Sequence, residues 1–289
     1  MNFYYKKKGL VISMKLTYFG TAAAEAVPAI FCNCDICKEA RKLGGKNIRT
    51  RSQALINDDL LIDLPADTYF HFLTNGIQGD LIKNLLVTHS HGDHLYAGEL
   101  EMRHSPFAHE LREKTLGVYG GAGVLRKIEQ VPSTKNVTVN KIAPYQPTEV
   151  GDYTVTALPA RHMDDPAEEP FIYIVKGKDA TMLYAHDTGY FFDEVFDYLA
   201  KEKIYFDCIS FDCTNVFLSF SDKGGHMGID NIRRLNAKLE SIGASDEKTV
   251  KIVSHFSHNG NPIHHILEEG VREYGWLVAY DGMQTEFTH

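Results

Sequence analysis

The sequence predicts an α/β fold in which two β-sheets form layers with helices. Short apolar runs rich in β-branched and aromatic residues recur more than ten times along the 289 residues, and amphipathic helical periodicity appears between some of them. No internal repeat, low-complexity segment or linker rich in Pro, Gly and Ser divides the chain. We therefore expect a single domain over residues 14–289, preceded by an N-terminal extension over residues 1–13.

The expected elements follow from the period of the apolar residues. Strands are expected at residues 16–19, 54–56, 60–64, 85–88, 118–119, 137–142, 153–158, 171–175, 181–184, 208–211 and 250–254. Helices are expected at 191–201, 229–242 and 262–274. In the last helix Asn261 is a suitable N-cap and Pro262 fits the first helical position. His264 and His265 lie inside it and are expected to be ordinary helix residues.

Composition narrows the classes of function. The formal net charge of −8 disfavours a nucleic-acid partner, because such proteins usually present a dense basic face. The best candidate for a local basic patch is Arg41, Lys42, Lys46, Arg49 and Arg51, although a solvated helix end explains these residues equally well. No apolar stretch approaches the roughly 18 residues of a membrane span, and the short segment 10–12 lacks the features of a signal peptide. We expect a cytoplasmic protein with a small substrate and no membrane contact.

Three of the five cysteines form the run Cys-x-Cys-x-x-Cys at Cys32, Cys34 and Cys37. Disulfides are a poor explanation, because nothing in the sequence marks secretion and such close neighbours rarely pair well. Three thiolates at this spacing are typical of a structural zinc site that still needs a fourth ligand. Cys208 and Cys213 flank an apolar strand and are expected to be inert core thiols.

The strongest chemical signal is the run 89–94, which reads His-Ser-His-Gly-Asp-His and directly follows an apolar strand. Burying these imidazoles and the carboxylate without partners would cost about 1–3 kcal/mol for each group. Neutral imidazole together with carboxylate suits divalent metals. His89, His91, Asp93 and His94 are therefore predicted to bind metal.

Further polar residues also follow predicted strands. His162 follows 153–158, Asp187 follows 181–184, and His255 follows 250–254. Side chains at strand ends can converge on one edge of a scaffold, and rigid metal sites are commonly built in this way.

Residues 88–94 resemble the His-x-His-x-Asp-His signature of the metallo-β-lactamase superfamily, and segments 159–162, 185–189 and 254–255 are similar to its later motifs. The resemblance covers the chain from about residue 14 to its end. It implies a four-layer αββα sandwich with a dinuclear metal site at the edge between the two sheets. It also implies the ligands: one metal is held by His89, His91 and His162, the other by Asp93, His94 and His255, with Asp187 bridging both.

The cysteine run resembles that of the cyclic phosphodiesterases associated with the carbon–phosphorus lyase pathway, which carry a structural zinc. This resemblance implies His258, three residues beyond His255, as the fourth zinc ligand; an ordinary loop residue is the alternative. It also implies a homodimer. A branch used in pyrroloquinoline quinone biosynthesis carries a similar cluster, so the zinc site alone does not settle function.

The resulting hypothesis is a dinuclear metal-dependent phosphodiesterase that acts on a small cyclic phosphodiester, with a phosphoribosyl cyclic phosphate as one candidate. The two active-site metals would be Zn, Mn or Fe. Metal-bound hydroxide would attack phosphorus at a site that includes Asp93, and His226 in the glycine-containing loop 223–228 would be the general acid. A solvent-exposed loop histidine is the alternative for His226.

Competing hypotheses are a nuclease of the transfer-RNA 3′-processing type, another hydrolase on the same scaffold, and a protein of the pyrroloquinoline quinone type. The acidic net charge disfavours the nuclease.

Three other residues have open roles. Asp63 either supports a metal ligand or lies in a surface turn, His186 is expected in the core or behind a ligand, and Arg161 either holds a phosphate or braces its loop.

Overall fold

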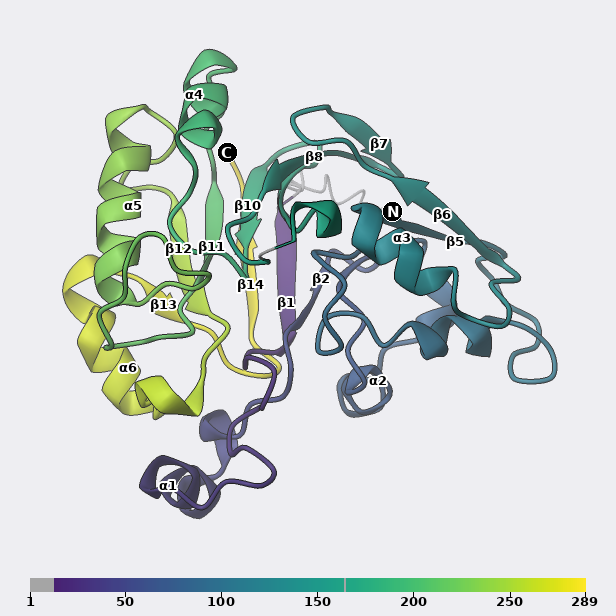
Figure 1. Ribbon diagram of the computed structural model, residues 1–289, viewed down its shortest axis with the longest axis horizontal. Coiled ribbons are helices and arrows are strands. Elements are labelled where there is room, and N and C mark those ends of the chain that lie inside the picture. The colour runs from purple at the N-terminus through teal and green to yellow at the C-terminus, as the bar shows by residue number, and fades with distance from the viewer. Residues whose placement is uncertain (1–12, 164) are drawn as a thin grey trace, which may run out of the picture.

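The computed structural model describes residues 13–163 and 165–289. The predicted N-terminal extension, apart from Ser13, lies outside the described residues. The chain forms two seven-stranded sheets that pack face to face, with helices on both outer sides (Figure 1). The predicted αββα fold class is therefore confirmed.

The first sheet has the strand order β14-β1-β2-β3-β4-β5-β6. Strands β3 to β6 run parallel, whereas β14, β1, β2 and β3 pair antiparallel in succession. Its strands are β1 (Met14–Gly20), β2 (Gln53–Ile56), β3 (Leu60–Ile62), β4 (Asn84–Leu86), β5 (Leu116–Gly120), β6 (Val137–Lys141) and β14 (Gln284–Phe287).

The second sheet has the strand order β13-β12-β11-β10-β9-β8-β7. Strands β10 to β13 run parallel, and β7 to β10 pair antiparallel. Its strands are β7 (Thr148–Val150), β8 (Tyr153–Pro159), β9 (Phe171–Lys176), β10 (Thr181–Ala185), β11 (Cys208–Asp212), β12 (Val250–Ser254) and β13 (Leu277–Val278).

All but one of the six described helices cover the outer faces of the sheets. The six helices are α1 (Asp35–Leu43), α2 (Thr68–Asn75), α3 (Ala122–Ile128), α4 (Asp193–Lys201), α5 (Ile229–Ser241) and α6 (His264–Val271). Short 3-10 turns are η1 (Gly45–Asn47), η2 (Gly79–Leu81), η3 (Ala97–Arg103), η4 (Pro166–Glu168), η5 (His258–Gly260) and η6 (Arg272–Tyr274). Helices α4, α5 and α6 pack on the second sheet, α2 and α3 flank the first, and α1 lies apart at the bottom of Figure 1. None of these described helices is long and apolar enough to cross a bilayer.

Three apolar layers separate the four layers of secondary structure. Leu16 and Ile56 of the first sheet meet Val155 and Tyr184 of the second in the central layer. The outer layers join each sheet to its own helices. Because side chains alternate between the two faces of a strand, strands covered on both faces read as nearly continuous apolar runs. Both sheets are thus rigid supports for the loops at their ends.

All the expected strands are present, but several elements were not expected: β7, β13, β14 and the helices α1, α2 and α3. The predicted start of α6 is wrong. Asn261 adopts a left-handed conformation with φ of 64° and ends the turn η5, and Ile263 is the N-cap of a helix that begins at His264. Asparagine tolerates the left-handed region, so it ended one element instead of beginning the next.

Candidate metal centre

The candidate metal centre lies where strands of both sheets end. The first sheet supplies Asp63 after β3 and the run 89–94 after β4. The second sheet supplies His162, Asp187 and His255 after β8, β10 and β12. All seven residues predicted to hold the two metals come together there, from segments that are far apart in the sequence.

Three residues of the centre have positive φ angles that only glycine adopts without cost. Asp63, Asp187 and His255 have φ of 64°, 51° and 63°. Such conformations cost on the order of 1–3 kcal/mol each and persist at functional sites. Here they turn the chain sharply at the strand end, which aims each side chain into the centre.

The first cluster joins His89, His91 and His162. The Nδ1 atom of His91 lies 3.0 Å from Nε2 of His89 and 3.1 Å from Nε2 of His162. Imidazole nitrogens that share a tetrahedral zinc at the usual bond length lie about 3.4 Å apart. The three nitrogens therefore converge closely enough to bind one cation.

The second cluster joins Asp93, His94 and His255, and Asp187 lies beside both clusters. Nε2 of His94 lies 3.4 Å from Asp93 Oδ2 and 3.4 Å from Nε2 of His255. Asp187 Oδ2 lies 2.5 Å from Nε2 of His94 and 2.8 Å from Nε2 of His255, and its other oxygen lies 3.5 Å from His162 Nε2. A carboxylate in this position can contact two cations at once.

The hydrogen bonds around the centre leave lone pairs facing one another. Nδ1 of His94 lies 2.7 Å from the buried carboxylate of Asp63, and Nδ1 of His255 lies 2.7 Å from Thr214 Oγ1. With its proton on Nδ1, each imidazole directs the Nε2 lone pair at Asp187 Oδ2. That oxygen is buried and has no hydrogen-bond donor among the described residues. Such an arrangement needs a cation, so the donor set fits a divalent metal.

The structure decides the role of Asp63. Its side chain is fully buried and accepts hydrogen bonds from the backbone N–H and the hydroxyl of Thr88 as well as facing His94. A surface turn is therefore the wrong interpretation.

Asp212 is a site residue that the sequence analysis missed. It ends β11, is fully buried, and accepts hydrogen bonds from the backbone N–H groups of Asp187 and Met227. Its Oδ2 atom lies 3.1 Å from Nδ1 of His226. The signal was available, because Asp212 follows a predicted strand just as His162, Asp187 and His255 do.

His226 lies beside the metal clusters and faces a cavity. Its Nδ1 atom is held by Asp212 and by Thr214 Oγ1 at 3.2 Å, which leaves Nε2 for other partners. Burial lowers the pKa of His226, but the charge and hydrogen bond of Asp212 outweigh it and raise the pKa to about 9. The neighbouring Gly225 carbonyl lies 3.4 Å from Nδ1 of His162 and orients that ring.

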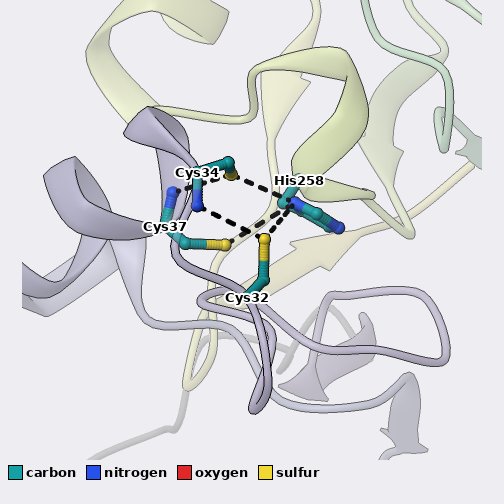
Figure 2. Close-up of side chains that lie close together, drawn as sticks. All are labelled: Cys32, Cys34, Cys37 and His258. Carbon is teal, nitrogen blue, oxygen red and sulfur yellow. Dashed lines mark hydrogen bonds between the residues drawn. The ribbon is translucent and has the colours of Figure 1, made fainter.

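A second cluster forms at α1 (Figure 2). Nδ1 of His258 lies 3.7, 3.4 and 3.6 Å from the sulfurs of Cys32, Cys34 and Cys37. A tetrahedral zinc with ordinary Zn–S and Zn–N bonds would place these atoms about 3.6 Å apart. Backbone N–H groups of Ala29, Cys34 and Cys37 also point at the sulfurs at 3.4–3.5 Å, which favours thiolates. The four side chains fit a structural zinc, and His258 is no isolated loop residue.

Other residues that the sequence singled out have structural contacts. His186 is buried between Ser52 and Ser210 at 3.1 and 2.7 Å, and burial lowers its pKa to about 3. Arg161 donates to the carbonyl of Tyr190 and lies over the ring of Phe192, so it braces its loop. Cys208 and Cys213 are buried in the core, as expected.

The candidate basic patch is wrong. Arg49 is buried and hydrogen-bonded to Thr21 and the Ala279 carbonyl, and its other nitrogen lies 3.1 Å from Nδ1 of His264. Arg51 pairs with Asp67 at 3.0 Å. These arginines fasten the segment that carries α1 to the rest of the chain and present no continuous basic face.

Comparison with known proteins places this geometry in a family. A family model described as beta-lactamase superfamily domain matches residues 70–256. No curated protein is detectably similar to the chain. The similar solved structures include one described as a new diphosphatase from the PhnP family, with 21% identity and a TM-score of 0.72, covering 96% of this chain and 98% of that one.

Two further structures share the fold. Zinc-bound PqqB from Methylobacterium extorquens is 18% identical with a TM-score of 0.72, covering 94% of this chain and 99% of that one. The short form of human tRNase Z is 15% identical with a TM-score of 0.63, covering 94% of this chain and 98% of that one. At these identities the likeness concerns the fold, while substrates must be argued from the site.

Proposed function

The chain belongs to the beta-lactamase superfamily and is a metal-dependent hydrolase; on that premise we propose that it hydrolyses a small cyclic phosphodiester. The observation that carries this proposal is the pairing of two metal-binding clusters around Asp187 with His226, whose Nδ1 atom is held by Asp212 beside them. Ring opening of a phosphodiester releases an alkoxide, which needs a proton donor in that position.

In this proposal His89, His91 and His162 would hold one divalent metal, Asp93, His94 and His255 would hold the other, and Asp187 would contribute to both sites. Two such cations would activate a water and neutralise charge on the phosphoryl oxygens. Asp63 and Thr214 hold the imidazoles of His94 and His255 in the tautomer that presents Nε2 to the centre. The rigid sheets fix these positions before substrate arrives.

His226 donates the proton to the leaving oxygen. Asp212 fixes its Nδ1 and keeps the ring charged, so Nε2 carries the proton toward the cavity. Once that proton is transferred, the neutral imidazole can be recharged from solvent, because the side chain is 30% exposed.

We further propose that Cys32, Cys34, Cys37 and His258 hold a structural zinc. His258 is three residues from His255, so the zinc would fix the loop after β12 from the far side. A nuclease of the tRNA 3′-processing type is disfavoured, because Arg49 is buried and Arg51 pairs with Asp67, which removes two of the candidate arginines from an RNA-binding face.

The proposal is tested with chelator-treated protein reloaded with Zn or Mn. We expect metal-dependent turnover of bis-p-nitrophenyl phosphate and of 2′,3′-cyclic nucleotides. Asp187→Asn should abolish both activities, whereas His265→Ala, at an exposed histidine of α6, should leave them unchanged. Absence of turnover with either metal restored would exclude the phosphodiesterase function.

A further inference from the structure

The cavity beside the candidate metal centre has a volume of about 540 Å³ and walls that the proposed chemistry does not use. One wall comes from the segment that leads to α1 and from the turn η5, with Glu25, Ser257 and Asn259. The other comes from the loop between β11 and α5, with Asn215, Leu218 and Phe220. These walls surround whatever part of the substrate extends away from the metals.

The cavity has no lysine or arginine among the described residues that line it. Phosphate groups in proteins are usually bound by arginine, lysine or a helix N-terminus. A second phosphate on the substrate would instead lie near the carboxylate of Glu25. The cavity therefore favours a substrate whose only anionic group is the one at the metals.

Leu218 and Phe220 present an apolar surface to this cavity, with 44% and 49% of their area exposed. The backbone behind them is fixed: Asn231 donates to the carbonyl of Phe220 at 3.1 Å and to Asp222 at 2.9 Å. Asp222 is held in turn by Arg234. Because the loop is already ordered, an aromatic group can pack on Phe220 without the entropic cost of ordering the loop.

Glu25 connects the cavity to the cysteine cluster. Its Oε1 atom accepts a hydrogen bond from Ser257 Oγ at 2.5 Å and lies 3.8 Å from Nε2 of His258. Its Oε2 atom has no donor among the described residues, and the side chain is 32% exposed. A free carboxylate oxygen that is fixed in this way is a suitable acceptor for a sugar hydroxyl.

We propose that Phe220, Leu218 and Glu25 form a subsite for a nucleoside, with the base against Phe220 and a ribose hydroxyl on Glu25. This inference rests on the proposed phosphodiesterase function and specifies its substrate class: cyclic phosphodiesters of nucleosides that carry no further phosphate. A phosphoribosyl cyclic phosphate lacks the aromatic base and carries a second anion, so it fits this cavity poorly.

The test compares Phe220→Ala with Phe70→Ala, which removes a similarly exposed phenylalanine, 55% exposed, from α2. The substrates are adenosine 2′,3′-cyclic phosphate, the same compound with a 5′-phosphate, and base-free ribose 2′,3′-cyclic phosphate. Phe220→Ala should raise KM for the first substrate by roughly tenfold with little change in kcat. It should leave KM for the base-free substrate unchanged, and Phe70→Ala should change neither.

Binding of adenosine to the zinc-loaded protein, followed by NMR, tests the subsite without catalysis, because adenosine has no phosphodiester to hydrolyse. We expect binding that Phe220→Ala removes and that Glu25→Gln weakens severalfold with the zinc content unchanged. Equal KM values for the two phenylalanine variants, a preference for the 5′-phosphorylated substrate, or no adenosine binding would overturn the inference. If no phosphodiester is hydrolysed but adenosine still binds through Phe220, the proposed function fails while the subsite stands.

Discussion

At the residue scale, His226 shows how one side chain acquires a chemical role from its neighbours. It lies in a glycine-containing loop, where a histidine alone would be half exposed and would titrate near its ordinary pKa. Asp212 changes this by fixing Nδ1 at 3.1 Å and stabilising the charged ring. The general-acid role that we propose therefore belongs to the pair, although only His226 was predicted from the sequence.

The first prediction concerns the leaving group. His226→Ala should lower kcat about 10²- to 10⁴-fold for substrates with a poor alkoxide leaving group, because the departing oxygen then leaves without a proton. Turnover of bis-p-nitrophenyl phosphate should change far less, since p-nitrophenolate leaves without protonation. Metal content measured by elemental analysis should stay constant. Equal losses on both substrates would assign His226 to metal binding instead.

The second prediction concerns Asp212. Asp212→Asn removes the charge that positions His226 but keeps the shape of the side chain. We expect a selective loss on poor leaving groups, smaller than the loss in His226→Ala, measured as the ratio of kcat values for the two substrate types. In the double variant the two effects should not add, because both act through the same proton. Additive losses would show that Asp212 acts independently of His226.

Asp212 follows the predicted strand 208–211, but it stands alone between Phe211 and Cys213 and belongs to no motif. Its position after a strand was therefore the only signal, and its burial and its contact with His226 depend on the fold. The run 89–94 was predictable for the opposite reason, since its density of ligands is itself the signal. Asp63 lay between these cases, because its distance from His94 depends on the pairing of β3 with β4.

At the element scale, α1 and its loop depend on the cysteine cluster more than on packing. The apolar group around α1 is small, with Ala22, Val27, Ala40 and Ile263 as its buried members. The Sγ atom of Cys34 caps the helix by accepting from the N–H of Cys37. The proposed zinc would thus replace a hydrophobic core in this segment.

The third prediction follows from this dependence. Cys37→Ser should remove one equivalent of zinc, make the segment 21–52 sensitive to limited proteolysis, and lower kcat by loosening the loop that carries His255. Elemental analysis and proteolysis followed by mass spectrometry would measure the first two effects. Cys208→Ala, at a thiol in the central core, is the matched control and should keep the full zinc content. Full zinc retention in Cys37→Ser would refute the proposed ligand set.

The elements that were not predicted from the sequence lack a strong apolar pattern. Strand β13 has two residues, and β14 pairs with β1 at the sheet edge, so neither carries a long apolar run. Helix α2 exposes Tyr69, Phe70 and Leu73, which blurs the contrast between its two faces. Strands β8 to β12 are buried on both faces and have longer apolar runs, so they could be predicted from the sequence.

At the scale of the whole molecule, the centre exists because two sheets end at the same edge. The first sheet contributes the run 89–94 and Asp63, and the second contributes His162, Asp187, Asp212 and His255. Each of the two metal-binding clusters takes side chains from both sheets. The geometry of the site therefore depends on the packing of the central apolar layer that joins the sheets. Loss of sheet packing should therefore release metal before secondary structure melts.

The fourth prediction concerns acid stability, which depends on buried neutral histidines outside the metal centre. His71 on α2 lies 2.7 Å from Gln53 Oε1 through Nδ1 and 2.7 Å from Thr50 Oγ1 through Nε2. Burial lowers its pKa from 6.5 to about 4, although Asp67 partly opposes this. Thr50 also contacts Asp281, whose own pKa is raised by burial.

Because the unfolded chain binds this proton at higher pH than the folded one, the contribution of His71 to stability is complete above pH 6.5. It should be lost as pH falls toward 4, by roughly 3 kcal/mol. His71→Gln keeps a hydrogen-bonding side chain but cannot titrate, so its unfolding free energy should fall less between pH 7 and pH 4.5. Metal release at acid pH affects both proteins, and the difference between their urea unfolding curves isolates His71. Parallel pH profiles for the two proteins would show that His71 is already charged in the folded state.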